Sequence, residues 1–263
     1  MPYAPTITLT DDQVEFYHTN GYLSIDAITT QEEIERLRVI YDRLFEQQAG
    51  RAEGNQFDLA GTDEDGKVAK LPQILSLRKY APELADTLYE TNAYAISRQL
   101  LGEGIHFTGD HAIFKPARSG APTPWHQDEA YWDAGTTYNS LSIWMPLQEA
   151  TLENGCMVFV PGSHTQEIVA HQAIGGDTRV HGLEMLQEVD QAKAVACPLP
   201  AGGATFHDSR TMHHTGANLS DIPRRAYIIG FGLPTEPRTD GRRFPWNEIR
   251  NTARSAREAA AKA

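Results

Sequence analysis

Two residues with metal-binding side chains, His126 and Asp128, stand two positions apart in the run Trp125-His126-Gln127-Asp128. On a β-strand this spacing places both side chains on the same face. Together with a second histidine they would form a two-histidine, one-carboxylate set that leaves one side of a metal ion open, as in non-haem Fe(II) oxygenases. The tripeptide alone is weak evidence: with ten histidines and 35 acidic residues in 263, about one match is expected by chance.

The third ligand would come from one of three histidines far along the chain, His207, His213 and His214. Neighbouring residues on a strand point to opposite faces, so His213 and His214 cannot both face one metal ion. Spacing alone does not choose among the three. At least some of them are expected to be ordinary core or surface histidines.

Arg224 and Arg225 precede a strongly apolar run, residues 226–231. A cation at the end of an apolar strand can extend into solvent, or its guanidinium can pair with a buried carboxylate. A metal site that uses a 2-oxo acid needs the second arrangement, because one end of the acid chelates the metal and the far carboxylate requires an anchor.

Composition excludes several classes of protein. The net charge of −12 argues against nucleic acid or an anionic membrane as the main partner. Two cysteines are too few for a disulfide framework, and neither a secretory leader nor an apolar run of membrane-spanning length is visible. We therefore expect a cytoplasmic enzyme that acts on a small molecule, as a monomer or homodimer.

The elements that must position these residues divide into helices and then strands. Capping boxes at Thr10 and Thr30 open two helices, and residues 49–67 are expected to form a loop or partly ordered flap. Short strand-like runs follow at 105–115, 123–129, 139–148, 155–161, 194–199, 204–207, 211–215 and 225–233. About eight such runs are typical of a jelly roll or barrel.

We predict a single domain, mainly β with flanking helices. Residues 1–104 would form a helical buttress on one sheet, and residues 105–233 the β core. A long insertion at 163–193 interrupts the core, and such loops are often lids over sites. Residues 246–263, rich in alanine and arginine, are predicted to form a solvated helical tail.

Taken together, these residues resemble the phytanoyl-CoA dioxygenase family of Fe(II)- and 2-oxoglutarate-dependent oxygenases. The resemblance covers most of the chain and is carried by Leu9–Val14, Asn20–Leu23, Trp125–Asp128, Trp144, Glu153–Met157, Pro161–His164, His213–Asn218 and Arg224. It implies a double-stranded β-helix, a distorted, cupin-like jelly roll with N-terminal helices packed on one sheet.

The resemblance also implies roles for individual residues. The family places its distal ligand five residues before an asparagine, which selects His213, and its co-substrate arginine falls on Arg224, with Arg225 as the fallback. Further contacts to 2-oxoglutarate are implied for Trp144, Ser163 and Lys70. The presence of Asp128 disfavours halogenation, because related halogenases have a small residue there.

The implied reaction uses Fe(II) bound by His126, Asp128 and His213, with 2-oxoglutarate and O₂. It would oxidise, most simply hydroxylate, an unactivated C–H bond of a small organic or natural-product substrate and release succinate and CO₂. The aromatic residues that follow the metal strand, Tyr131, Trp132 and Tyr138, are candidates for the substrate wall, although ordinary packing explains them equally well. Two alternatives remain: a cupin-like metalloenzyme that does not use 2-oxoglutarate, and a catalytically idle binding protein on the same fold.

Overall fold

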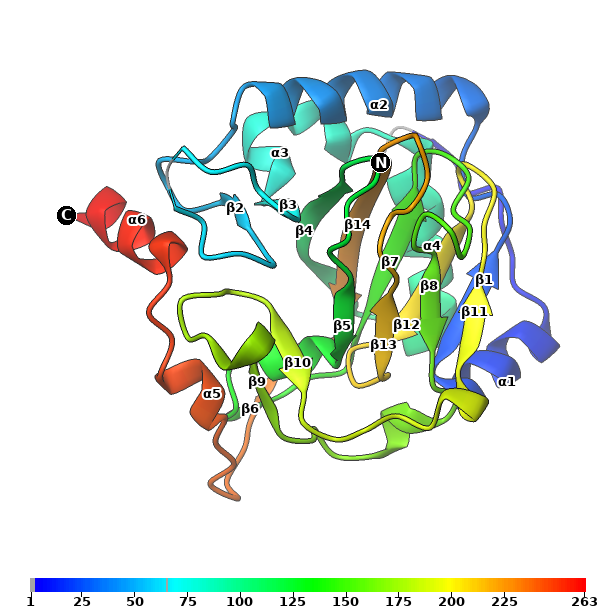
Figure 1. Ribbon diagram of the computed structural model, residues 1–263. Helices are drawn as coiled ribbons and strands as arrows, with labels where there is room; N and C mark the ends of the chain where they lie inside the picture. Colours follow the sequence, from blue (N-terminus) through cyan, green and yellow to red (C-terminus); the bar gives the residue numbers. More distant parts are fainter. Residues whose placement is uncertain (1–2, 65) are drawn as a thin grey trace.

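The computed structural model describes residues 3–64 and 66–263, which build two antiparallel β-sheets that face each other (Figure 1). In spatial order, the larger sheet contains β1 (Tyr22–Ile25), β12 (Ala204–Asp208), β7 (Ser140–Pro146), β14 (Arg224–Gly232), β4 (His106–Lys115), β3 (Pro72–Leu75) and β2 (Gln56–Asp58). The smaller sheet contains β11 (Val195–Cys197), β8 (Met157–Phe159), β13 (His213–Thr215) and β5 (Thr123–His126). This arrangement confirms the predicted jelly roll.

Strand β7 shows how the two faces of the larger sheet differ. Its alternate residues Leu141, Ile143 and Met145 are buried in the apolar core beneath the helices. The residues between them face the other way, and Ser142 and Trp144 line a cavity between the sheets. The period of two along a strand thus separates the residues that hold the fold together from those available for chemistry.

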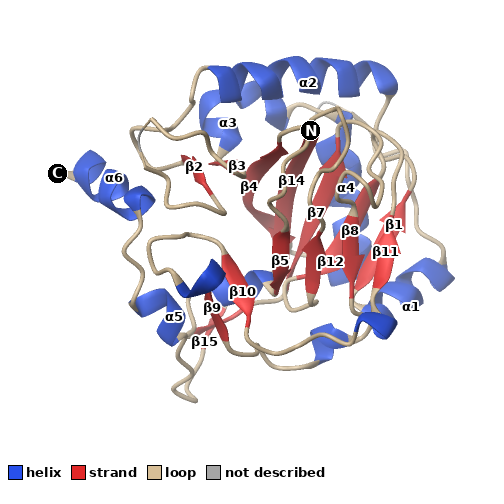
Figure 2. Ribbon diagram, viewed as in Figure 1, coloured by secondary structure: helices blue, strands red, loops and turns tan. Residues whose placement is uncertain are grey.

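The helices cover the outer face of the larger sheet, as predicted (Figure 2). They are α1 (Asp11–Asn20), α2 (Gln31–Glu46), the short α3 (Leu77–Tyr80) and α4 (Leu88–Leu101). The capping box at Thr10 is present, and the Thr30 side chain accepts a hydrogen bond from the Glu33 amide. Helix α1 ends at Gly21 with φ of 77°, where a Cβ atom would collide with the His164 ring.

Two segments outside the core differ from the sequence expectation. The predicted flap at 49–67 contains β2, which extends the edge of the larger sheet. The C-terminal tail forms α5 (Pro245–Glu248) and α6 (Ala253–Lys262) but is not simply solvated. Arg254 donates to the Gly54 carbonyl, and Arg257 forms an ion pair with Asp63. The tail therefore contacts the predicted flap at Gly54 and Asp63, a contact between distant segments that local patterns cannot reveal.

The predicted insertion at 163–193 forms a hairpin of β9 (His171–Ala173) and β10 (Leu183–Met185). It lies between the C-terminal helices and β5 (Figure 1). A further pair of short strands joins β6 (Thr136–Thr137) to β15 (Glu236–Pro237). Within the described part of the chain, no helix has both the length and the apolar character needed to span a membrane.

Candidate active site

The two histidines predicted as ligands lie directly opposite each other on neighbouring strands. His126 ends β5, His213 begins β13, and the two residues are paired in the antiparallel register, with ring centroids 4.2 Å apart. The Nδ1 atom of His126 lies 2.8 Å from the Pro124 carbonyl, and that of His213 lies 2.8 Å from the Thr211 carbonyl. A carbonyl only accepts, so each Nδ1 carries the proton and each Nε2 is left with a lone pair, the tautomer that a metal ligand needs.

Asp128 completes the set, but not from the strand that the sequence predicted. Strand β5 ends at His126, and Asp128 begins a single 3₁₀ turn that runs to Tyr131. The chain leaves the strand at Gln127, whose side chain is held by the Arg210 carbonyl. The expected strand at 123–129 is therefore too long, yet the carboxylate still reaches the histidines.

The ligand atoms of these three residues converge. Asp128 Oδ1 lies 3.6 Å from His126 Nε2 and 3.5 Å from His213 Nε2, and one atom from each residue lies within 4.8 Å of the others. Burial alone would raise the pKa of Asp128, but the adjacent histidines outweigh it and hold this pKa well below its usual value. Burial keeps the pKa of His213 well below 6.5. A neutral imidazole and a carboxylate are the forms that bind a metal ion.

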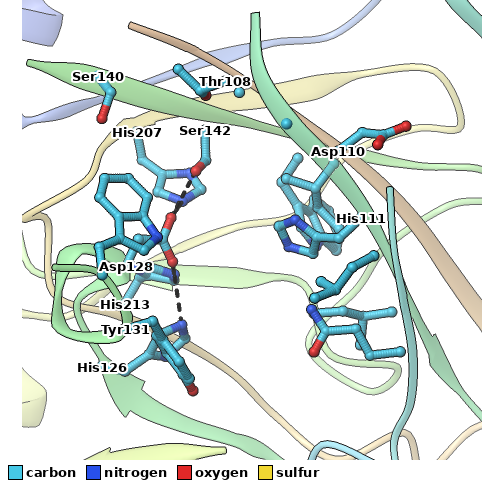
Figure 3. A pocket seen from close by; sticks show the side chains of 18 of the residues that line it. Thr108, Asp110, His111, His126, Asp128, Tyr131, Ser140, Ser142, His207 and His213 are labelled. Atoms are coloured by element: carbon cyan, nitrogen blue, oxygen red, sulfur yellow. Dashed lines mark hydrogen bonds and ion pairs between the residues drawn. The ribbon is translucent and has the colours of Figure 1, made fainter. Parts of the chain in front are cut away.

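The second carboxylate oxygen of Asp128 has partners of its own. Ser142 Oγ donates to Asp128 Oδ2 at 2.7 Å, and His207 Nε2 lies 3.3 Å from the same oxygen (Figure 3). His207 is thus a contact of the carboxylate and not one of the three converging ligands. His214 faces away from the site and packs against the Trp125 ring. The structure therefore distinguishes the three late histidines: His213 faces the ligand set, His207 contacts the second oxygen of Asp128, and His214 lies outside the site.

A buried arginine faces the same cavity. Arg224, at the start of β14, is 1% exposed, and its guanidinium carbon lies 5.2 Å from the Trp144 ring centroid. Its Nε and Nη1 atoms are buried and have no hydrogen-bond partner among the residues that the structure describes. Burial lowers the pKa of Arg224 to about 10, so the side chain is charged at neutral pH. A buried, unpaired cation is costly, and a carboxylate would satisfy it.

Arg225, the fallback for that role, points to the opposite face of β14. Its Nε and Nη2 atoms donate to the two oxygens of Asp42 at 2.6 and 2.9 Å. This arginine already has its carboxylate and lies outside the cavity lining. The alternation along the strand therefore distinguishes the two arginines.

The cavity has a volume of about 770 Å³ and is lined by residues from both sheets and from the accessory segments. All three metal-ligand candidates, Arg224 and Trp144 line it. So do the aromatic candidates for the substrate wall, Tyr131, Trp132 and Tyr138. The Tyr131 hydroxyl accepts a hydrogen bond from the Leu183 amide at 2.7 Å, which ties this wall to the insertion.

Two predicted co-substrate contacts lie elsewhere. The Ser163 hydroxyl donates to the Val160 carbonyl at 2.7 Å and accepts from the Met212 amide at 2.9 Å. It orders the backbone just before His213 and is outside the cavity lining. Lys70 is exposed and also outside the lining. Contact of these two side chains with 2-oxoglutarate therefore stays a prediction.

Sequence reasoning missed a large part of the cavity lining. Asp110 and His111 from β4 lie across the cavity from the ligand candidates (Figure 3). His181 from the insertion and Arg250 and Arg254 from the C-terminal segment also line the cavity. For β4 the strand was predicted, but not which of its faces meets the cavity. For the other three residues no local signal exists, since they reach the cavity through contacts between distant segments.

Comparison with known families gives the same assignment. The model of the family described as phytanoyl-CoA dioxygenase (PhyH) matches residues 17–226. The chain belongs to this family. One relative, a probable alpha-ketoglutarate-dependent hypophosphite dioxygenase from Stutzerimonas stutzeri, is 28% identical over 227 residues, which cover 84% of this chain and 77% of the relative.

Solved structures of other oxygenases share the fold of this PhyH-family protein. EvdO2 from Micromonospora carbonacea var. aurantiaca, solved in complex with 2-oxoglutarate, is 38% identical with a TM-score of 0.78, covering 94% of this chain and 99% of that one. SnoK, an alpha-ketoglutarate-dependent carbocyclase from nogalamycin biosynthesis, is 25% identical with a TM-score of 0.68, covering 91% and 92%. The predicted family, its oxygenase class and its use of iron, 2-oxoglutarate and O₂ are thereby confirmed.

Proposed function

We propose that His126, Asp128 and His213 bind Fe(II) in this chain, and that Arg224 binds the distal carboxylate of 2-oxoglutarate. The observation that carries this proposal is the unpaired guanidinium of Arg224 in the same cavity as three converging ligand atoms. When bound, the iron and 2-oxoglutarate supply, with O₂, the oxidising power for attack on a C–H bond. The protein supplies ligation, orientation and a cavity that limits access of water.

Each part of that contribution has a structural basis. The carbonyls of Pro124 and Thr211 hold the two imidazoles with Nε2 available. Ser142 and His207 hold one oxygen of Asp128, which leaves Oδ1 as the atom nearest both histidines. The charge of Arg224 offsets that of a carboxylate, and its fork suits two parallel hydrogen bonds.

We also propose that the substrate is a small organic molecule of natural-product type and that hydroxylation is the simplest outcome. A cavity of about 770 Å³ is within the range that accommodates a drug-sized ligand. The related SnoK is a carbocyclase, and SnoN, which shares the fold, is an epimerase. Ring formation is therefore a second possible outcome within the same proposal.

Neither alternative class accounts for Arg224. A cupin-like metalloenzyme that did not use 2-oxoglutarate, or an idle binding protein, would leave an unpaired buried cation beside the metal ligands without a role. A cytoplasmic location is part of our proposal, supported by Cys156 and Cys197, which are buried and unpaired as in a reducing compartment. The oligomeric state, monomer or homodimer, stays a prediction.

The test is a titration with Fe(II) and 2-oxoglutarate without oxygen, followed by visible absorption. A charge-transfer band is expected for the wild type and should vanish in His126→Ala. His214→Ala is the matched control, because this neighbour of His213 faces away from the site and should keep the band. A wild type without a band, or a band that survives His126→Ala, would contradict the proposal.

A further inference from the structure

Arg250, in the segment between α5 and α6, lines the same cavity as the metal ligands. Its guanidinium carbon lies 5.3 Å from the Tyr131 ring centroid. The Tyr131 ring in turn stands edge-on to the His126 ring, with centroids 5.9 Å apart. Arg250 is therefore separated from a metal ligand by a single aromatic side chain. It reaches the cavity from a different element than Arg224, which packs on Trp144.

Arg250 differs from the other arginines of the C-terminal segment. Each of those has a polar partner in the fold: Arg238 with Asp240, Arg242 with Glu129, Arg243 with Glu248, Arg254 with the Gly54 carbonyl, and Arg257 with Asp63. The Nε and Nη2 atoms of Arg250 are buried, and within residues 3–64 and 66–263 neither has a hydrogen-bond partner. Arg250 is partly exposed as a residue and packs on Tyr131, but buried N–H donors without an acceptor are unfavourable, so this position is suited to an anion from outside the chain.

Among the described residues, no carboxylate accepts from the buried Nε and Nη2 donors of Arg250. Burial lowers the pKa of Arg250, and the nearby Arg254, a second cation that lines the cavity, acts in the same direction. In a protein of net charge −12, Arg250 and Arg254 place two cations in the cavity lining, and of the two, within the part of the chain that the structure describes, only Arg254 has a nearby carboxylate, that of Glu258 at 3.9 Å. Such a site attracts anions that the rest of the surface repels.

His181, from the insertion, adds a neutral polar group to this part of the cavity. Its ring lies 6.1 Å from the Tyr131 ring and 4.7 Å from the Phe57 ring, centroid to centroid. Burial keeps its pKa well below 6.5, so the ring is uncharged and carries one N–H group. Its Nδ1 atom is buried and, in the described chain, unpartnered. The cavity thus places a fork-shaped cation and a neutral hydrogen-bonding ring beside one aromatic side chain.

We propose that Arg250, together with His181, binds an oxyanion group of the primary substrate, a carboxylate or a phosphate. This inference rests on the proposed function and deepens it, because it names the substrate class as small molecules with an anionic end. Tyr131 then separates the bound anion from the metal ligands, so the reacting carbon lies across that ring from the anion. Arg250 would select the substrate, whereas Arg224 binds the co-substrate.

Two variants distinguish a role of Arg250 in oxyanion binding from a role in holding the C-terminal segment in place. Arg250→Met keeps the aliphatic part of the side chain and removes the charge and the donors. Arg257→Met is the matched control: it lies in the same segment, pairs with Asp63 and is outside the cavity lining. If Arg250 acted only by docking the C-terminal segment, both variants would have the same effect.

The experiment is calorimetric titration of protein loaded with Fe(II) and 2-oxoglutarate without oxygen, so that Arg224 is already occupied. The probes are benzoate, inorganic phosphate and, as a neutral control, benzyl alcohol. At least one oxyanion should bind the wild type and bind Arg250→Met about 10- to 100-fold more weakly. Arg257→Met should match the wild type, and benzyl alcohol should not distinguish the three proteins. The stronger of the two oxyanions identifies the carboxylate or the phosphate source.

Equal oxyanion affinity in the wild type and Arg250→Met, equal losses in both variants, or no binding of either oxyanion would overturn the inference. Failure of the proposed function gives a different result, the absence of a charge-transfer band with Fe(II) and 2-oxoglutarate. In that case the same titrations, made in an Arg224→Met background, still report on Arg250 alone.

Discussion

The two ends of the cavity are built in different ways. At the metal end, His126 and His213 are register partners on adjacent core strands, and each non-ligating Nδ1 atom is bonded to a carbonyl. At the far end, His181 and Arg250 come from an insertion and a C-terminal segment, and they keep buried polar atoms without partners in the described chain. At the metal end the non-ligating Nδ1 atoms of both histidine candidates have acceptors, whereas at the far end His181 and Arg250 keep donors and acceptors free for a ligand.

This difference indicates how the protein divides its tasks. Ligands held by strand register cannot move independently, which suits a reaction that requires fixed geometry. Recognition groups carried by accessory segments can change without disturbing the sheets, because loops tolerate substitution and insertion. The comparison also places Arg224 with the metal end, since it belongs to a core strand although its guanidinium is unpaired.

The largest effect that would sharpen this comparison is expected at Arg224. Arg224→Met should weaken 2-oxoglutarate binding by about 100-fold, because a charge-assisted fork is lost. Arg225→Met should leave that affinity unchanged and lower the free energy of unfolding by about 1 kcal/mol, because its ion pair with Asp42 is partly exposed. Titration of the charge-transfer band gives the first quantity and urea unfolding the second. If Arg225→Met is the variant that loses affinity, the anchor has been assigned one residue too early.

The sequence signals for the metal end are local. The His126–Asp128 spacing and the family motif around His213 selected three side chains that the structure brings together, and the strand runs indicated the sheets that carry the histidines. The length of β5 was wrong, because its end depends on a hydrogen bond from Gln127 to the Arg210 carbonyl, 83 residues away along the chain.

The far end could not be predicted, because it too depends on contacts between segments that are distant in the sequence. His181, Arg250 and Arg254 reach the cavity only after the tail has packed on residues 49–67 and the insertion has folded beside β5. Ser163 shows a limit of motif reasoning. Its place in a motif suggested a ligand contact, whereas the folded chain uses its hydroxyl for the Val160 carbonyl and Met212 amide. A short motif identifies a position in the chain, but not whether a side chain serves the ligand or the backbone.

A smaller effect is expected where Asp128 is held in place. Ser142→Ala removes the hydrogen bond to Asp128 Oδ2 and should weaken Fe(II) binding by about tenfold, since partners of metal ligands fix their orientation. Ser140→Ala is the matched control. It lies two residues away on the same strand face and lines the same cavity, and its hydroxyl has no hydrogen-bond partner in the described structure. Competition with a metal chelator measures both affinities, and equal values for the two variants would mean that the metal end is less rigid than its contacts imply.

The smallest effect concerns the junction between the two ends, where the insertion meets Gln127. The backbone N–H of Gln127 donates to His171 Nε2 at 3.3 Å. The backbone N–H of Val169 donates to the side-chain oxygen of Gln127 at 3.0 Å. Burial lowers the pKa of His171 to about 4, although its bond to the Val169 carbonyl acts in the opposite direction. The neutral ring accepts from Gln127, whereas a protonated ring cannot.

The sign of the pH dependence follows from that lowered pKa. Between pH 6.5 and 4, His171 is protonated in the unfolded chain but still neutral in the folded chain. The free energy of unfolding therefore falls as the pH decreases. From pH 7.5 to 5.5 we expect His171 to account for a loss of about 1 kcal/mol. Urea unfolding of the metal-free protein at both pH values gives the total change. His171→Gln keeps an acceptor but does not titrate, so its loss should be smaller by that amount, while other buried histidines contribute equally to both proteins. If the wild type and His171→Gln lose the same free energy of unfolding between the two pH values, the insertion is not held at Gln127 by a neutral His171. Other contacts would then join the two ends.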